Sequence, residues 1–469
     1  MAPDADKLRQ RQTTAVAKHN AATISTQERL CSLSSLNGEE VCIDGIIYDL
    51  QSFDHPGGET IKMFGGNDVT VQYKMIHPYH TEKHLEKMKR VGKVTDFVCE
   101  YKFDTGFERE IKREVFKIVR RGKDFGTLGW FFRAFCYIAI FFYLQYHWVT
   151  TGTSWLLAVA YGVSQAMIGM NVQHDANHGA TSKRPWVNDM LGLGADFIGG
   201  SKWLWQEQHW THHAYTNHAE MDPDSFGAEP MLLFNDYPLD HPARTWLHRF
   251  QAVFYMPVLA GYWLSAVFNP QILDLQQRGA LSVGIRLDNA FIHSRRKYAV
   301  FWRAVYIAVN VIAPFYTNSG LEWSWRVFGN IMLMGVAESL ALAVLFSLSH
   351  NFESADRDPT APLKKTGEPV DWFKTQVETS CTYGGFLSGC FTGGLNFQVE
   401  HHLFPRMSSA WYPYIAPKVR EICAKHGVHY AYYPWIHQNF LSTVRYMHAA
   451  GTGANWRQMA RENPLTGRA

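Results

Sequence analysis

Four long apolar runs divide this chain into parts that must meet lipid and parts that need not. They cover residues 128–149, 155–170, 298–315 and 327–349. A helix of about 20 mostly apolar residues crosses a hydrocarbon core about 30 Å thick. The runs form two pairs, each joined by a short loop, so we expect two helical hairpins and four transmembrane helices.

The basic residues predict how these hairpins are oriented. The loops that join the pairs, residues 150–154 and 316–326, contain Arg326 as their one basic residue, whereas the segments at the other ends of the runs are rich in Lys and Arg. The positive-inside rule places those basic segments in the cytosol. Two shorter apolar stretches, residues 186–205 and 252–268, have basic loops on both sides, so we expect them to be interfacial or re-entrant.

Composition excludes several classes of protein. The net charge is +3 over 469 residues, which argues against a nucleic-acid-binding surface. The seven cysteines are widely separated and form no Cys-x-x-Cys pair, so neither a disulfide framework nor an iron–sulfur cluster is expected. The first 30 residues are polar and contain no signal-peptide core, so the start of the chain is expected to stay in the cytosol.

The pattern along the chain predicts a multi-domain protein. A polar tail covers residues 1–32, and a small α+β domain covers 33–101, where short β-like runs alternate with helical pieces. A charged helical linker at 102–127 leads to an all-α integral-membrane domain at 128–440. A C-terminal tail follows at 441–469.

The small domain contains the segment His55-Pro56-Gly57-Gly58, followed by a Gly-rich turn and by His77-Pro78. Proline and two glycines let the backbone turn sharply beside a flat cofactor, and imidazoles from two facing helices can fill both axial positions of an iron porphyrin. The domain resembles cytochrome b5. That resemblance implies heme b with His55 and His77 as axial ligands, His80 being the alternative to His77, and a heme that transfers electrons without binding oxygen.

Histidines gather in four places next to the apolar runs, all on the predicted cytosolic side. Imidazoles at positions i and i+3 or i+4 of a helix share a face and can meet one metal centre. Eight histidines exceed what one tetrahedral zinc can use, and imidazole suits iron, copper, nickel and zinc, so a dinuclear centre is the simplest interpretation. The eight are His174, His178, His209, His212, His213, His350, His401 and His402.

The boxes HxxxH, HxxHH and QxxHH, in this order over residues 128–433, resemble those of the integral-membrane fatty acyl desaturases and their hydroxylase relatives. The resemblance implies two non-heme irons held by the seven box histidines, with O2 as co-substrate. It makes Gln398 a ligand or near neighbour and His350 an extra ligand. Gln398 in the third box, together with the fused heme domain, resembles the front-end subgroup, which desaturates between an existing double bond and the carboxyl end.

Within that subgroup the sequence is most similar to microalgal Δ5 desaturases, which implies a cis double bond at Δ5 in C20 polyunsaturated chains such as 20:3n-6 and 20:4n-3, giving arachidonic and eicosapentaenoic chains. The implied partners are an acyl-lipid or acyl-CoA substrate, the lipid bilayer, and a cytochrome b5 reductase that supplies electrons from NADH, because the chain contains no dinucleotide fingerprint. The implied location is the endoplasmic reticulum membrane, with the heme domain and the histidine boxes facing the cytosol.

Several alternatives share parts of this pattern. A Δ6, Δ8 or Δ4 acyl desaturase, or a sphingolipid long-chain-base desaturase, has the same layout, and an acyl hydroxylase begins with the same hydrogen abstraction. A zinc-dependent hydrolase is suggested by His174-Asp175-Ala176-Asn177-His178, although Asp175 replaces the glutamate base of HExxH. A non-catalytic heme-binding membrane adaptor would keep His55 and His77 but would not need ordered boxes.

Overall fold

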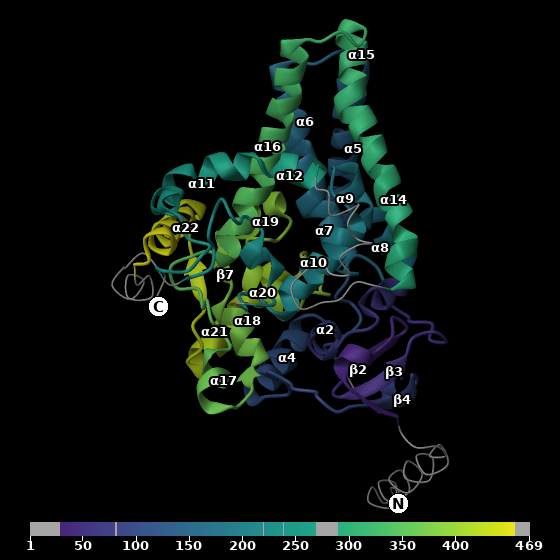
Figure 1. The fold of residues 1–469 in the computed structure, drawn as a ribbon, viewed down its shortest axis with the longest axis vertical. Helices are drawn as coiled ribbons and strands as arrows, with labels where there is room; N and C mark the ends of the chain where they lie inside the picture. Colours follow the sequence, from purple (N-terminus) through teal and green to yellow (C-terminus); the bar gives the residue numbers. More distant parts are fainter. Residues whose placement is uncertain (1–28, 80–81, 219, 238, 269–288, 455–469) are drawn as a thin grey trace, which may run out of the picture.

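The computed structural model describes residues 29–79, 82–218, 220–237, 239–268 and 289–454 (Figure 1). A column of long helices stands at one end of the molecule and the N-terminal domain lies at the other, with shorter helices between them. This is the predicted class of fold: an N-terminal domain with strands, followed by a mostly helical domain with candidate membrane spans.

The N-terminal domain is built on a four-stranded sheet in the order β1-β4-β3-β2, in which β1 runs parallel to β4 and the other pairs are antiparallel. Asp44 and Gly45 both have positive φ, so the turn between β2 and β3 has the twist that a two-residue hairpin needs. The sheet begins at Arg29, ahead of the predicted start at 33. Its elements are β1 (Arg29–Cys31), η1 (Leu33–Ser35), β2 (Glu40–Ile43), β3 (Ile46–Asp49), η2 (Glu59–Phe64), α2 (Thr70–Ile76), α3 (Glu82–Leu85) and β4 (Lys89–Val94).

Four helices are long and apolar enough to cross a membrane, as predicted. Each starts at a residue whose side chain accepts a hydrogen bond from the first turn: Thr127, Ser154, Asn289 and Ser324. They are α5 (Leu128–Thr150), then α6 (Trp155–Ile168) with η3 (Gly169–Gln173) and α7 (His174–Asn177), then α14 (Ala290–Ile307) with η6 (Ala308–Ile312) and α15 (Ala313–Ser319), and α16 (Trp325–His350).

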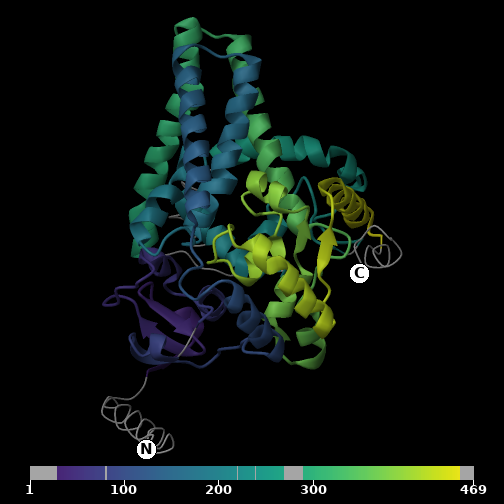
Figure 2. The ribbon, with the colours of Figure 1, turned by 180° about the vertical axis from the view of Figure 1, so that it is seen from behind.

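The second and third spans are longer than predicted. The second continues through a π-helical turn to Asn177, so His174 lies inside the span and not after it. The third starts at Ala290 and includes three basic residues in its first turns. Figure 2 shows the α5–α6 hairpin packed along the pair formed by α14–α15 and α16.

The two shorter apolar stretches do not form straight spans. Residues 186–205 fold as short pieces, α8 (Pro185–Gly192), α9 (Gly194–Phe197) and the start of α10 (Lys202–Ala214). The second stretch follows η5 (Trp246–Phe250) and forms α11 (Gln251–Ala260) and α12 (Tyr262–Phe268), bent by 50° from each other. Pro257 lies inside α11. By length and composition this bent pair is a re-entrant segment or one broken span.

The remaining elements form the part of the molecule between the column and the N-terminal domain. They are β5 (Tyr101–Lys102), α4 (Gly106–Ile118), η4 (Pro223–Phe226), α17 (Ala361–Thr366), β6 (Val370–Asp371), α18 (Trp372–Glu378), β7 (Cys381–Tyr383), α19 (Phe386–Thr392), α20 (Gln398–Leu403), α21 (Tyr412–His426), β8 (Ala431–Tyr433) and α22 (Ile436–Thr452).

Two of the predicted boundaries fall within packed structure. The segment predicted as a linker contains α4, which packs against α21, and Glu110 on α4 accepts hydrogen bonds from Lys425 (2.6 Å) and His426 (2.8 Å). The predicted boundary at 440 lies inside α22, whose buried Tyr446 and Met447 pack with α11 residues. Hydrophobic burial therefore extends the helical domain in both directions.

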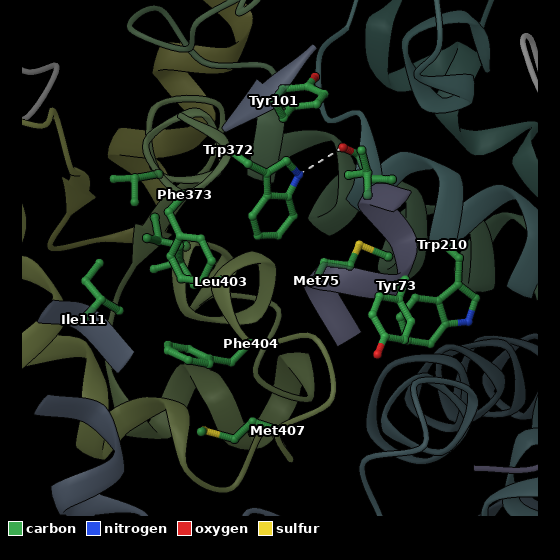
Figure 3. Packing of buried hydrophobic residues seen from close by; sticks show 14 of the residues in the cluster. Tyr73, Met75, Tyr101, Ile111, Trp210, Trp372, Phe373, Leu403, Phe404 and Met407 are labelled. Carbon is green, nitrogen blue, oxygen red and sulfur yellow. Dashed lines mark hydrogen bonds between the residues drawn. The ribbon is translucent and has the colours of Figure 1, made fainter. Parts of the chain in front are cut away.

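The N-terminal domain shares one hydrophobic cluster with the helical domain (Figure 3). Tyr73 and Met75 of α2 belong to the same cluster as Trp210 of α10, Trp372 of α18 and Phe404 after α20. The indole of Trp372 also donates a hydrogen bond to the carbonyl oxygen of Ala214 (3.1 Å). The N-terminal domain is thus packed against the helical domain and not simply tethered to it.

We expect Trp372→Ala to lower the free energy of unfolding by about 3–5 kcal/mol, because it removes a fully buried indole from this shared cluster. Thermal unfolding in detergent, followed by circular dichroism, measures the change. Trp372→Phe keeps a ring in the cavity and should lose less stability. Equal stability of the wild type and Trp372→Ala would contradict the packing described here.

Candidate functional site

The histidines form two groups close to the C-terminal ends of the second and fourth candidate membrane spans. In the first group, ligand nitrogens of His174, His178, His209 and His401 all lie within 4.8 Å of one another. In the second group, those of His212, His350 and His402 do the same. Each group has the compactness that one metal ion requires.

Helices α10 and α20 contribute to both groups. On α10, His209 faces the first group and His212 the second; on α20, the adjacent His401 and His402 point to different groups, as successive residues of a helix are turned by about 100°. Their Nε2 atoms are close: His174 Nε2 lies 3.2 Å from His209 Nε2, and His212 Nε2 lies 3.3 Å from His350 Nε2.

His213 and Gln398 complete the arrangement. The ring of His213 stacks on His402 with centroids 4.1 Å apart, and its Nε2 lies 3.1 Å from Nε2 of His209, so it stands between the groups. The side-chain nitrogen Nε2 of Gln398 lies 3.1 Å from His350 Nε2 and 3.2 Å from His402 Nε2, which places the Gln398 amide at the second group.

Acceptors outside the groups fix the tautomers of four imidazoles. Nδ1 of His350 lies 3.0 Å from the carbonyl oxygen of Thr379, and Nδ1 of His402 lies 2.8 Å from Gln376 Oε1. Neither acceptor can donate, so each Nδ1 carries the proton and each Nε2 presents a lone pair to the interior.

The other two imidazoles are His401 and His212. Nδ1 of His401 lies 2.9 Å from the hydroxyl of Tyr412, which itself donates to the carbonyl oxygen of Met407 and so accepts from His401. Nδ1 of His212 lies 2.9 Å from a carboxylate oxygen of Asp222. Partners of this kind orient metal-bound histidines in proteins.

Burial sets the protonation of most of these imidazoles. It lowers the pKa of His178, His209, His213, His401 and His402 well below the ordinary value, so they are neutral and can donate a lone pair. His212 differs: burial opposes its charging, but Asp222 and Asp224 outweigh burial and raise its pKa to about 9. The two carboxylates thus make His212 the most basic donor of this set.

The buried donor atoms fit a metal ion. Within the described part of the chain, both ring nitrogens of His178, Nε2 of His401 and Oε1 of Gln398 are buried without a hydrogen-bond partner. An unsatisfied buried polar group costs about 1–3 kcal/mol, and cations bound to these atoms would remove that cost. A set of imidazole nitrogens with an amide oxygen suits iron, copper, nickel or zinc.

Asp175 has a structural position in the first box. Its carboxylate accepts hydrogen bonds from Ser408 Oγ (3.0 Å), Ser409 N (2.9 Å) and Ser409 Oγ (2.9 Å), which tie the end of the second span to the turn after α20. This role differs from that of a general base, so the geometry disfavours the hydrolase alternative.

The second site lies in the N-terminal domain, where the rings of His55 and His77 face each other with centroids 6.0 Å apart. Nδ1 of His55 donates to the carbonyl oxygen of Gly58 (3.1 Å) and Nδ1 of His77 to that of Tyr73 (2.7 Å), leaving both Nε2 atoms for a metal. Burial lowers the pKa of His55 and lowers that of His77 to about 3. The donor set and the surrounding apolar side chains fit a porphyrin iron.

The prediction that these two histidines lie on facing helices is wrong. His55 lies in the loop before η2, and His77 is the residue that ends α2. The alternative ligand His80 lies outside the described residues. Gly57 is required beside His55, because a Cβ there would lie 2.7 Å from the imidazole Cε1.

Several residues of the site have no motif that identifies them. The residues that hold imidazoles from outside come from three segments that only the fold brings together: Asp222 before η4, Gln376 and Thr379 at the end of α18, and Tyr412 at the start of α21. Asp222 had a weak indicator, since the segment Asp222-Pro223-Asp224 follows the second box closely.

Comparisons with known proteins agree with this division. The profile of the family Fatty acid desaturase matches residues 147–434, and that of the family Cytochrome b5-like Heme/Steroid binding domain matches residues 32–95. The acyl-lipid (7-3)-desaturase of Rebecca salina is 30% identical over 413 residues, covering 86% of this chain and 89% of the relative.

Two further relatives carry different names. The chloroplastic acyl-lipid (7-3)-desaturase of Chlamydomonas reinhardtii is 32% identical over 431 residues, covering 87% of this chain and 80% of the relative. The Delta(5) fatty acid desaturase A of Dictyostelium discoideum is 26% identical over 445 residues, covering 89% of this chain and 91% of the relative.

We expect Asp222→Asn to lower the affinity of the histidine groups for metal about 10- to 100-fold, because the carboxylate that accepts from Nδ1 makes His212 a stronger donor. Metal titration of the purified chain measures this. The matched control is Asp224→Asn: Asp224 lies 3.6 Å from the same Nδ1, and its side chain is 41% exposed, so its loss should matter less. Equal metal affinity in the wild type and Asp222→Asn would refute the role of Asp222.

Proposed function

Because the chain belongs to the fatty acid desaturase family and carries a cytochrome b5-like domain, we propose that it is a front-end desaturase with a di-iron centre. The family makes it a membrane oxidoreductase that acts on fatty acyl chains. The observation that carries the finer proposal is the pair of imidazole groups, each with its donor atoms within 4.8 Å. Gln398 at the second group and the fused heme domain support the front-end assignment.

In this proposal the two groups hold two non-heme irons. The first iron is held by His174, His178, His209 and His401 with His213 beside them, and the second by His212, His350 and His402 with Gln398. When bound, the irons would supply the oxidising power, with O2, to remove two hydrogens from neighbouring methylenes of an acyl chain. Side-chain acids and bases cannot break such C–H bonds.

The residues around the two groups orient the imidazoles, keep most of them uncharged and exclude water from the site. The outer acceptors hold the imidazoles in one tautomer, so little reorganisation is needed when a metal binds. Both His174 and His350 lie in the last turns of membrane spans, which supports delivery of an acyl chain from the bilayer to the groups. The buried position of the groups supports exclusion of water from the reacting carbon.

The heme domain is proposed to deliver electrons one at a time, supplied from NADH by a separate cytochrome b5 reductase. The packing of α2 against α10 supports transfer within one chain. We further propose an endoplasmic reticulum location, with the heme domain and the histidine groups on the cytosolic side. The basic residues outside the hairpin loops support this orientation.

The acyl substrate is proposed to be a C20 polyunsaturated chain that receives a cis double bond at Δ5, such as 20:3n-6 or 20:4n-3. Relatives named Delta(5) fatty acid desaturase support this position, while those named acyl-lipid (7-3)-desaturase carry a different designation. An acyl-lipid carrier is supported by the latter names, and acyl-CoA is the alternative.

Expression in a host fed 20:3n-6 should produce 20:4n-6, detected as its methyl ester by gas chromatography with mass spectrometry. Hosts fed substrates for Δ4, Δ6 and Δ8 desaturation serve as parallel controls. A new double bond at another position would overturn the Δ5 assignment while leaving the desaturase proposal intact, and a hydroxylated product would overturn the latter.

Variants of the two sites should separate their roles. His55→Ala should abolish the heme absorption band and nearly all product, because one axial ligand is lost, while leaving non-heme iron bound. His401→Ala should abolish product but keep the heme band. Absorption spectra, iron analysis and product profiles of both variants test this. Full activity of His55→Ala would exclude the heme of this chain as the electron route.

A further inference from the structure

A cavity between the two domains joins the two candidate sites. The cavity is partly open to solvent, and residues of both domains line it. Its wall on the N-terminal domain includes His55, His77 and the apolar side chains of Phe64 and Ile76. Its opposite wall belongs to the helical domain and includes His178 of the first imidazole group.

The opposite wall carries positive charge. Arg406, which follows the third histidine box, lines the cavity, as does Lys183 in the loop before α8. Arg406 sits beside the turn after the first box, since a Cβ placed on Gly179 would lie 3.8 Å from its Nε. Arg406 and the imidazoles of His55 and His77 line the same cavity.

Arg406 lacks a carboxylate partner among the residues that the structure describes. Asp124 attracts it electrostatically but does not form an ion pair with it. The guanidinium is itself largely desolvated, which lowers its pKa and makes an unpaired charge costly. A partly buried arginine that faces a cofactor cavity without an acidic partner is suited to an anionic group of the ligand, because its planar fork binds carboxylates in bidentate fashion.

We propose that Arg406, with Lys183 at the exposed rim, binds the propionate carboxylates of the heme, so that the helical domain completes the heme site. The inference rests on the assignment of His55 and His77 as heme ligands but not on the regiochemistry or on the metal of the histidine groups. Arg406 is therefore a positioning residue that fixes the cofactor against the wall containing His178.

An ion pair and a hydrogen bond join the N-terminal domain to α14 beside the cavity. Arg295 on α14 contacts Glu59 at the start of η2 (2.7 Å), and the side chain of Asn289, which caps α14, donates to the carbonyl oxygen of Met63 (2.9 Å). These contacts flank the segment that carries the heme-side wall.

The test compares heme with heme dimethyl ester, whose propionates carry no charge, in the full-length chain. In the wild type, excess apomyoglobin should remove the dimethyl ester about tenfold faster than heme or more. The reason is that charged hydrogen bonds to one carboxylate are worth about that factor. In Arg406→Gln the ratio of the two loss rates should fall several-fold, whereas Arg406→Lys, which keeps a positive charge, should retain part of the wild-type ratio. Arg184→Gln is the matched control, since Arg184 is an exposed neighbour of Lys183 that does not line the cavity.

A second readout is the reduction potential of the heme. Loss of the positive charge should make it more negative in Arg406→Gln, because the ferrous form is favoured by nearby positive charge, while Arg184→Gln should not change it. Equal loss rates of heme and its dimethyl ester from the wild type would overturn the proposal without any variant. Loss of heme from His55→Ala, by contrast, tests the ligand assignment alone.

Discussion

The histidine groups depend on keeping imidazoles neutral inside a dry protein interior. A buried imidazolium is costly, and burial lowers the pKa of most of the eight histidines, so they face one another as lone-pair donors. Acceptors such as the Thr379 carbonyl and Gln376 hold Nδ1–H from outside and turn Nε2 inward. Without these acceptors, rings at contact distance could adopt either tautomer, and the donor atoms would not converge.

This constraint explains how the membrane helices and the site are connected. The second and fourth spans carry His174 and His350 in their last turns, so the placement of these helices also sets the position of one donor in each group. Helices α10 and α20 then supply donors to both groups at once. The N-terminal domain packs on α10, so the proposed heme site lies next to the helix that supplies donors to both groups. The shared cluster around Trp372 makes this domain contact part of the hydrophobic core.

The sequence was sufficient to predict the spans and the boxes, because apolar length and helical spacing are local properties. It could not predict which histidine joins which group, because neighbours such as His401 and His402 diverge on their helix. Nor could it identify Tyr412 or Arg406, which act through tertiary contacts. The candidate heme ligands His55 and His77 were predicted to lie on helices. The structure places His55 in a loop and His77 at a helix end, where the carbonyl oxygens of Gly58 and Tyr73 orient their rings.

The iron content of the purified, active chain tests the central claim most directly. Total iron by mass spectrometry and heme by the pyridine hemochrome assay, both per mole of protein, give the non-heme iron by difference. The account predicts about two non-heme irons for each heme, and their loss together with product formation on chelation. A fully active preparation that is saturated with heme and contains no other iron would contradict it.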